Sequence, residues 1–215
     1  RRANVTIHPQ MKQGSKEWLD WRMMGLGGSD IASLLGISPY DDATPNHLWL
    51  EKTGRFVKPD NYAMRRGRIL EPMVREWYEE HSGIKWETLC GEHDTHSWVH
   101  SSFDGVSPMM DIIAEIKCPR AEIHNMAISG KVPDFNRVQI EWQLLTSGAR
   151  ECRYVSYYGH DKPGAQPKFH ESLKFVEIVV KPDHEIQNRI YRIAREFWIR
   201  VEAYWAKQSI PKRVA

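Results

Sequence analysis

Residues 102–119, with the sequence SFDGVSPMMDIIAEIKCP, decide the fold that we expect for this chain. Two short β-rich stretches within them are separated by turn residues and predict a hairpin. Because successive side chains of a strand alternate between its two faces, Glu115 and Lys117 point the same way. The hairpin would bring Asp104, at the turn end of the first strand, beside them.

Two carboxylates and a lysine in this arrangement suit a site for a divalent metal ion. Mg²⁺ and Mn²⁺ prefer hard oxygen ligands, which Asp104 and Glu115 offer, and the carbonyl of Ile116 can add another oxygen. Lys117 would then orient or activate a water molecule and stabilise charge on phosphorus. Two metal ions about 3.5–4 Å apart would clamp the attacking and leaving oxygens of a phosphodiester.

The spacing from Asp104 to Lys117 also fits a plainer interpretation, in which a Glu and a Lys occupy the solvated face of a strand. The neighbouring residues argue against it. Glu115 and Lys117 alternate with isoleucines in a strand that is otherwise suited to a core. A buried strand rarely carries charged side chains that have no partners.

Outward from this hairpin, the hydrophobic period alternates between that of helices and that of strands. The expected helices are residues 16–23, 30–35, 45–52, 61–82, 123–129, 134–146 and 183–207. The expected strands are residues 85–89, 98–101, 103–106, 112–117, 153–158 and 173–180. This order predicts an α/β fold with a mixed central β-sheet flanked by α-helices.

The length of 215 residues fits one compact domain, which we expect over residues 14–215 after an N-terminal lead-in at 1–13. The chain has 30 Lys and Arg against 28 Asp and Glu, a formal charge of +2, which excludes a generic basic coat for nucleic acids. Nucleic acid remains open as a substrate, because charge can be segregated within one fold. No apolar run approaches the roughly 20 residues of a membrane helix, so we expect no membrane span.

The cysteines predict a reducing compartment. Cys90, Cys118 and Cys152 are odd in number and widely spaced, which argues against a disulfide framework and favours ordinary buried thiols. Cys90 is followed by three histidines at a spacing that is unusual for a zinc site, so we do not expect zinc there. The histidines concerned are His93, His96 and His100.

Six short motifs follow one another along the chain. They are EWLDWR at 17–22, GGSD at 27–30, GRILE at 67–71, SFDG at 102–105, EIKCP at 115–119 and QIE at 139–141. In this order they resemble the lambda exonuclease, or YqaJ-like viral recombinase, branch of the PD-(D/E)XK nucleases. The resemblance covers residues 14–148 and implies a restriction-endonuclease-like core. An ordered set of this kind is far more specific than any one of its members.

The resemblance implies roles for the hairpin and for two helices. Asp104 and Glu115 match metal-binding carboxylates, the Ile116 carbonyl matches an added ligand, and Lys117 matches the catalytic lysine. Glu71 matches an acidic residue that contributes to the metal site, and Gln139 matches a glutamine that helps to hold the water or the metal. Two plainer roles stay open: Glu71 could pair with Arg75 one turn on, and Gln139 could be polar surface.

The same resemblance implies a pocket for a terminal 5′-phosphate at Arg22, Ser29 and Ser102. The forked guanidinium of Arg22 suits a phosphate, and Ser29 lies at an expected helix N-terminus, where anions are favoured. The alternatives are an outward-pointing arginine and a serine that only caps its helix.

Positive charge is concentrated in residues 55–75. This window holds six Arg and Lys and two acids, Asp60 and Glu71, so six minus two gives +4. Its basic residues are Arg55, Lys58, Arg65, Arg66, Arg68 and Arg75. A solvated helix face is one explanation, but the run abuts Glu71, so we favour contact of Arg65, Arg66 and Arg68 with DNA phosphates. Met64 lies where the family can place an apolar wedge that separates the end base pair.

Two positions depart from the family pattern. Phe103 stands before Asp104, where the family often has Pro, and Glu141 stands where members often carry a second glutamine. Neither change removes a catalytic group, but Glu141 leaves the role of its helix open.

Taken together, the resemblance implies a metal-dependent exonuclease, with two Mg²⁺ ions that Mn²⁺ can replace. It would act on double-stranded DNA ends that carry a 5′-phosphate, degrade the 5′ strand in the 5′-to-3′ direction and leave 3′ single-stranded tails for phage-type recombination. It implies a ring-shaped homotrimer, a single-strand annealing protein as partner, and the cytoplasm of a bacterial host of the phage or prophage. The alternatives are a structure-specific or single-strand nuclease of the same superfamily, and a non-catalytic DNA-binding module.

Overall fold

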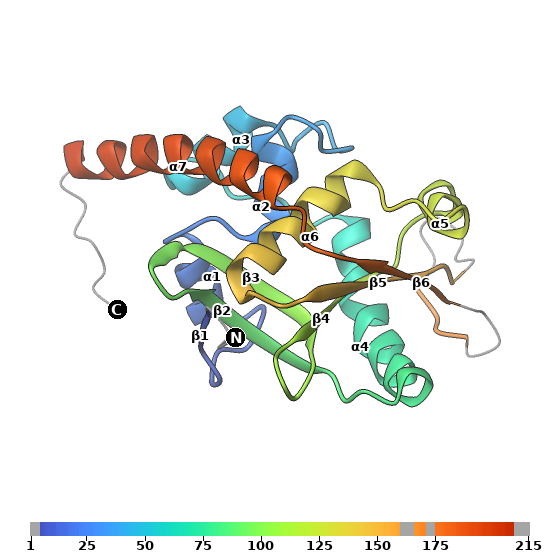
Figure 1. Ribbon diagram of the computed structural model, residues 1–215. Coiled ribbons are helices and arrows are strands. Elements are labelled where there is room, and N and C mark those ends of the chain that lie inside the picture. Colours follow the sequence, from blue (N-terminus) through green and yellow to red (C-terminus); the bar gives the residue numbers. More distant parts are fainter. Residues whose placement is uncertain (1–4, 160–165, 171–174, 209–215) are drawn as a thin grey trace.

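A computed structural model describes residues 5–159, 166–170 and 175–208 of the chain. Its centre is a six-stranded sheet in the order β1-β2-β3-β4-β5-β6 (Figure 1). The strands are β1 (Val5–Ile7), β2 (Glu87–His93), β3 (His96–Val106), β4 (Ile112–Lys117), β5 (Glu151–Tyr157) and β6 (Phe175–Val180). The helices are α1 (Lys16–Arg22), α2 (Gly28–Leu34), α3 (Pro45–Lys52), α4 (Tyr62–Ser82), α5 (Ala121–Ile128), α6 (Asp134–Ser147) and α7 (His184–Lys207). The expected α/β fold with a mixed, helix-flanked sheet is confirmed.

The sheet is antiparallel from β1 to β4 and again from β5 to β6, and β4 pairs with β5 in parallel. The parallel pair requires a crossover, which α5 and α6 provide. In its register Lys117 lies opposite Ser156, at the ends of the two strands.

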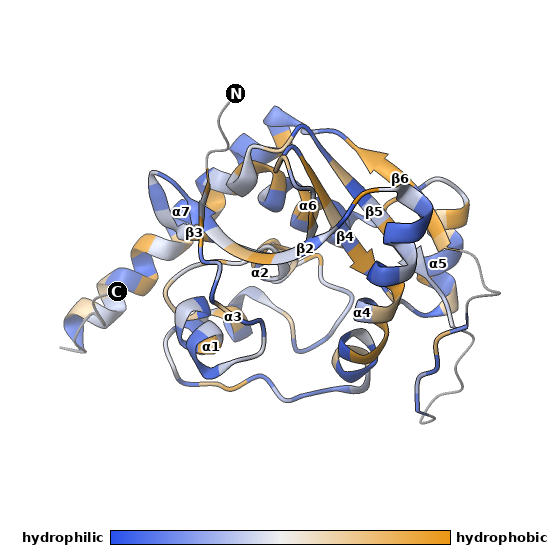
Figure 2. Ribbon diagram, turned by 90° about the horizontal axis from the view of Figure 1, so that it is seen from below, coloured by the Kyte–Doolittle hydropathy of each residue, from blue (hydrophilic) through white to orange (hydrophobic). Residues whose placement is uncertain are grey.

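Helices cover both faces of the sheet. α6 lies across one face, with α2 and α7 packed on it, and α4 covers the opposite face (Figure 1). β4 is buried on both sides, because Ile112 and Ile116 pack in the cluster around α4 while Ile113 packs in the cluster that contains α6. Figure 2 shows the consequence: β4 is mostly hydrophobic, while the helices alternate in hydropathy.

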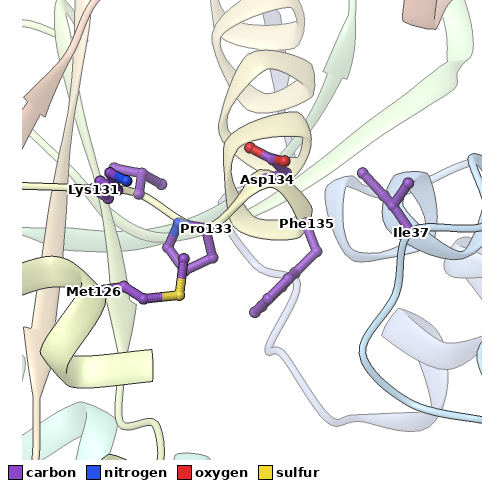
Figure 3. A pocket seen from close by; sticks show the side chains of 7 residues that line it. Ile37, Met126, Lys131, Pro133, Asp134 and Phe135 are labelled. Atoms are coloured by element: carbon purple, nitrogen blue, oxygen red, sulfur yellow. The ribbon is translucent and has the colours of Figure 1, made fainter. Parts of the chain in front are cut away.

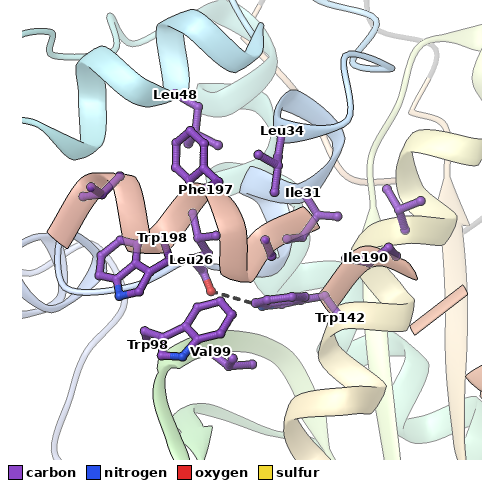
Figure 4. Close-up of a cluster of buried hydrophobic side chains, with 13 residues drawn as sticks. Leu26, Ile31, Leu34, Leu48, Trp98, Val99, Trp142, Ile190, Phe197 and Trp198 are labelled. Carbon is purple, nitrogen blue, oxygen red and sulfur yellow. Dashed lines mark hydrogen bonds between the residues drawn. The ribbon is translucent and has the colours of Figure 1, made fainter. Parts of the chain in front are cut away.

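The loop between α1 and α2 is held against β3 by backbone and core contacts. Leu26 donates from its nitrogen to the Trp98 carbonyl at 2.8 Å and accepts from the His100 nitrogen at 2.9 Å. The Trp142 indole also donates to the Leu26 carbonyl at 3.0 Å, within the cluster in Figure 4. Gly25 is required beside it, because a Cβ there would lie 2.4 Å from the Trp98 carbonyl oxygen. This anchoring fixes the start of α2 relative to the sheet.

Helix ends follow the sequence signals. Thr44 caps α3 with Pro45 in its first turn, and Asp183 caps α7 through two backbone nitrogens. Gly83 and Gly148 end α4 and α6 with φ of 67° and 68°, as expected for left-handed C-caps. α4 continues through Pro72, where a kink could have been expected.

Several expected strands differ from the structure, and the expected strand 85–89 corresponds to β2, which begins at Glu87 and continues to His93. Residues 5–7 of the expected lead-in form β1, because Val5 pairs with His93 and Ile7 with Gly91 at the edge of the sheet. The expected strands 98–101 and 103–106 are one strand, β3, because backbone pairing with β2 continues through the polar Ser102. The first two residues of the expected strand 173–180 lie outside the described residues.

In the described part of the chain, none of the helices has the length and hydropathy needed to cross a membrane.

Candidate active site

β3 and β4 separate at the point where the predicted catalytic residues lie. Their register pairs Gly105 with Ala114 and Val106 with Ile113. Beyond these pairs the Asp104 side chain replaces the backbone of β3 as the hydrogen-bond acceptor for β4. Its Oδ2 accepts from the backbone nitrogen of Ile116 at 2.8 Å. The side chain of Asp104 therefore occupies the gap between the strands, next to the segment that carries Glu115 and Lys117.

Glu115 is completely buried and is held by three donors. Its Oε1 accepts from Gln139 Nε2 and its Oε2 from Gln143 Nε2, each at 2.6 Å. Lys117 Nζ forms an ion pair with Oε1. A buried carboxylate needs such partners. Gln139 therefore faces the hairpin, and the alternative of a free polar surface residue is excluded.

Gln143 is a site residue that the sequence interpretation missed. It lies four residues after Gln139, so both amides share one face of α6. This spacing of four residues was the sequence signal that could have identified Gln143. Glu141, between them, is turned to α7: it accepts from Arg137, from the Gln187 amide at 2.9 Å and from the Asp183 nitrogen at 3.0 Å. Glu141 thus joins α6 to α7 and does not contact Glu115.

Glu71 approaches the hairpin from α4. It pairs with Arg75 at 3.6 Å, the plainer role left open by the sequence, and its charge also interacts with Lys117 and Glu115. Arg75 in turn donates to the Asp104 carbonyl at 3.3 Å, which ties α4 to β3. The ion pair with Arg75 is therefore present, and Glu71 also lies close enough to Glu115 and Lys117 for their charges to interact. We call Glu71, Asp104, Glu115 and Lys117 the carboxylate site.

The electrostatics of the carboxylate site reflect an excess of negative charge. Burial, with repulsion from Glu115 and Glu71, raises the pKa of Asp104 well above its usual value. Burial also raises the pKa of Glu71, and Glu115 adds to the shift. For Lys117 burial acts to lower the pKa, but the three carboxylates outweigh it and raise that pKa.

The donor set fits a divalent cation. Three carboxylates face two cations, Lys117 and Arg75, and their oxygens are hard ligands. Their mutual repulsion would be relieved by a positive ion. Within residues 5–159, 166–170 and 175–208, no three His, Cys, Asp or Glu side chains already surround a point suited to a metal. The Glu115 oxygens accept from Gln139, Gln143 and Lys117, so a metal would compete with these donors.

The predicted phosphate-binding residues gather at the end of α1. Arg22 Nη2 donates to Ser29 Oγ at 3.0 Å and to Asp30 Oδ1 at 2.9 Å. The Arg22 guanidinium lies over the Trp18 ring, 5.0 Å from its centroid, and the Trp18 indole donates to Ser102 Oγ at 2.8 Å. Arg22, Ser29 and Ser102 therefore form one group, which we call the anion pocket.

One cavity of about 130 Å³ joins the anion pocket to the carboxylate site. It is lined by Gln13, Trp21, Arg22, Gly27, Gly28, Ser29, His100, Ser102, Asp104, Gln139 and Gln143. Gly28 allows the close approach of α2 to α6, because a Cβ there would lie 3.2 Å from the Gln139 side chain. The two predicted groups of site residues are thus neighbours in space.

A larger hollow of about 620 Å³ lies elsewhere (Figure 3). It is lined by Ile37, Met126, Lys131, Val132, Pro133, Asp134 and Phe135, at the ends of α2 and α5 and the start of α6. None of the predicted site residues lines it, so the larger hollow and the predicted site are in different parts of the molecule.

The basic run divides into exposed and buried members. Arg65 and Arg68 are exposed and pair with Asp60 at 3.6 and 2.7 Å, and Met64 is 38% exposed near the start of α4. Arg66 is only 5% exposed and donates to the carbonyls of Cys118 and Pro119. Arg66 therefore holds the end of β4, and a DNA-contacting surface would have to use Arg65 and Arg68.

The cysteine and histidines after residue 89 make other contacts. Cys90 lies beneath Ser102, with Sγ 3.7 Å from Oγ, and His93 stacks on His96 with ring centroids 5.2 Å apart. His100 is buried and stacks on Trp21 at 4.1 Å. All three cysteines are free thiols.

Residues 17–150 match the family model described as the YqaJ-like viral recombinase domain, which covers every motif quoted above. The chain belongs to this family. Among curated relatives, Uncharacterized protein YqaJ of Bacillus subtilis (strain 168) is 26% identical over 204 residues, 92% of this chain and 59% of that protein. An uncharacterized protein of Acanthamoeba polyphaga mimivirus is 27% identical over 164 residues, 68% of this chain and 29% of that protein. The chain therefore spans less than two thirds of each of these relatives.

Solved structures share the fold of this YqaJ-family chain. The alkaline exonuclease LHK-Exo from Laribacter hongkongensis aligns with a TM-score of 0.72 at 22% identity, over 91% of this chain and 98% of that chain. LHK-Exo in complex with dAMP aligns equally well, at 23% identity. A phage related exonuclease from Haemophilus somnus aligns with a TM-score of 0.60 at 9% identity, over 86% of this chain and 96% of that chain.

Proposed function

We propose that this chain is a metal-dependent deoxyribonuclease that acts on duplex ends carrying a 5′-phosphate. The observation that carries the proposal is the shared cavity, which is lined by the anion pocket and by Asp104, Gln139 and Gln143. The descriptions of the similar structures as exonucleases, one of them with dAMP, support a nucleic-acid substrate.

Asp104, Glu115 and Glu71, with the carbonyl of Ile116, are the residues that would hold Mg²⁺. Two ions would activate a water molecule and neutralise charge on the phosphodiester, and Mn²⁺ could replace them. Gln139 and Gln143 orient the Glu115 carboxylate through its two oxygens. Lys117 would orient the attacking water and stabilise charge on the phosphate, because its Nζ is held next to the metal-binding residues by the ion pair with Glu115.

The anion pocket would determine which end is used. A phosphate bound by Arg22 and Ser29 would lie in the same small cavity as the Asp104 carboxylate, so only a short length of backbone would separate it from the cleaved bond. This arrangement favours removal of nucleotides from the 5′ end, in the 5′-to-3′ direction, over internal cleavage. The product would be a 3′ single-stranded tail.

The viral recombinase family supports the biological setting that we propose. The tail would serve phage-type homologous recombination, with a single-strand annealing protein as partner, in the cytoplasm of a bacterial host of the phage or prophage. We also propose a homotrimeric ring that encloses the duplex. Arg65 and Arg68 are the exposed cations of α4 that would contact DNA phosphates there, and Met64 would separate the end base pair.

Digestion of end-labelled linear duplex tests the proposal. With Mg²⁺ we expect rapid release of 5′ nucleotides from 5′-phosphorylated ends, slower release from 5′-hydroxyl ends and no cleavage of circular duplex. Equal cleavage of circular and linear DNA would instead indicate a structure-specific or single-strand nuclease. Binding without any cleavage in Mg²⁺ or Mn²⁺ would indicate a non-catalytic module.

A further inference from the structure

A buried lysine lies directly behind the anion pocket. Lys52, the last residue of α3, is fully buried and its Nζ is 2.8 Å from Asp30 Oδ2. The same Nζ donates to the backbone carbonyl of Arg22 at 2.9 Å. Burial of an ammonium group is unfavourable unless the group is paired and hydrogen-bonded. Both partners of Lys52 are connected to the anion pocket: one is the Arg22 carbonyl, and the other, Asp30, binds the Arg22 guanidinium.

Asp30 connects this lysine to the other end of Arg22. Its Oδ1 accepts from the Arg22 guanidinium at 2.9 Å, while its Oδ2 accepts from the backbone nitrogen of Gly27 at 2.8 Å. Arg22 is thus held at its carbonyl by Lys52 and at its guanidinium by Asp30. Burial alone would raise the pKa of Asp30, but Lys52 and Arg22 outweigh it and lower that pKa to about 2.

The remaining donors of Arg22 are left for a ligand. Among the described residues, the hydrogen bonds of its side chain run from Nη2 alone, to Ser29 and Asp30. A guanidinium has five N–H donors, so Nε and Nη1 keep theirs available. Arg22 and Lys52 are matched by Asp30 and by Glu51, whose charge interacts with all three, so the free guanidinium donors, not a net charge, would bind a phosphate.

The field of these cations extends along the cavity. His100 lines the same cavity, and burial, followed by the charge of Lys52, lowers its pKa to about 3, although Asp30 acts in the opposite direction. His100 is therefore uncharged at neutral pH and adds no cation of its own. The positive charge that faces a bound anion comes from Arg22 and from the lysine behind it.

We infer that Lys52 is a positioning residue: through Asp30 and the Arg22 carbonyl it holds the Arg22 guanidinium in place for a terminal 5′-phosphate, and it thereby sets the preference of the site for phosphorylated ends. This inference rests on the proposed function. It assigns to three short helices a role in specificity, because α1, α2 and α3 contribute Arg22, Asp30 and Lys52 respectively.

The test compares kcat/KM on linear duplexes with 5′-phosphate and 5′-hydroxyl ends. Lys52→Met keeps the length of the side chain and removes its charge, and we expect the phosphate preference to fall about tenfold. In the Arg22→Ala variant, adding Lys52→Met should not lower the phosphate preference any further, because Lys52 acts through Arg22. Lys207→Met, at the exposed end of α7, is the matched control and should leave the preference unchanged.

A purely structural role would lower both rates together and leave their ratio unchanged, and that result in folded Lys52→Met protein would overturn the inference. If Lys52→Met does not fold, the Lys52→Met/Asp30→Asn double variant removes both buried charges and should show the same loss of preference. An unchanged ratio of the rates on 5′-phosphate and 5′-hydroxyl ends in this double variant would also overturn the inference. A wild-type chain that cleaves both ends equally would instead refute the proposed end recognition itself.

Discussion

The anion pocket and the carboxylate site share one cavity, yet their charges are balanced differently. Burial acts to raise the pKa of both Asp30 and Asp104. At Asp30, Lys52 and Arg22 outweigh burial and the pKa falls, whereas at Asp104 two further carboxylates add to burial and the pKa rises. Behind the anion pocket, two cations, Lys52 and Arg22, therefore keep the buried Asp30 ionised. The three carboxylates of the carboxylate site have two cations beside them, Lys117 and Arg75, and we propose that metal ions supply the missing positive charge.

The largest effect should follow from removal of that lysine. Lys117→Ala should lower kcat for Mg²⁺-dependent digestion on the order of 10³-fold, because the site loses the group that orients water and stabilises charge. The phosphate preference of the residual activity should stay as in the wild type, since the anion pocket is intact. Undiminished digestion by Lys117→Ala would contradict the catalytic assignment.

Gln143→Ala tests whether α6 orients the carboxylate site. The Glu115 Oε2 atom would lose a 2.6 Å hydrogen bond inside a fully buried environment. We expect kcat to fall about tenfold and the free energy of unfolding to fall by roughly 1.5–3 kcal/mol, as for a lost hydrogen bond to a charged group. Gln139→Ala should behave similarly. If Gln143→Ala changes stability but not kcat, α6 only supports the fold.

The acid limb of unfolding tests the balance in the anion pocket. The pKa of Asp30 is lower in the folded chain than its ordinary 3.8, so its ionised form contributes stability above pH 4. That contribution, about 2 kcal/mol, should be lost as the pH falls from about 4 to about 2. Denaturant unfolding of wild type and Asp30→Asn at several pH values measures it. Equal acid slopes for the two proteins would show that Asp30 is not stabilised by its cations.

The smallest effect should come from the exposed cations of α4. Arg68→Ala should reduce the slope of log affinity for duplex DNA against log salt by about 0.9, one phosphate contact. Arg189→Ala, an exposed arginine of α7, is the control and should leave the slope unchanged. Identical slopes for Arg68→Ala and wild type would remove Arg68 from the proposed DNA surface.

The hairpin could be predicted because its signal is local. Period-two alternation places Glu115 and Lys117 on one side, and the turn returns the chain to Asp104, so sequence spacing decides the geometry. β1 could not be predicted in this way: it has three residues and forms only by pairing with β2, more than eighty residues away. Its short sequence carries too little periodicity to distinguish it from a loop.

The supporting residues were harder to predict for a related reason. Gln143 contacts Glu115 only through the placement of α6 over β4, and a second glutamine one turn on is also typical of a polar surface. Lys52 and Asp30 resemble ordinary helix-end charges in the sequence, and only the packing of α3 against α2 shows that they are buried together. Tertiary contacts, which single-sequence patterns do not contain, decide these positions.

The Mg²⁺ dependence of nucleotide release from 5′-phosphorylated linear duplex tests the central claim most directly. The charge imbalance of the carboxylate site predicts release that rises with Mg²⁺ to saturation, stops when a chelator is added, and is lost in Asp104→Asn protein that is still folded. Release at the same rate in the presence of the chelator, or by Asp104→Asn, would contradict the account.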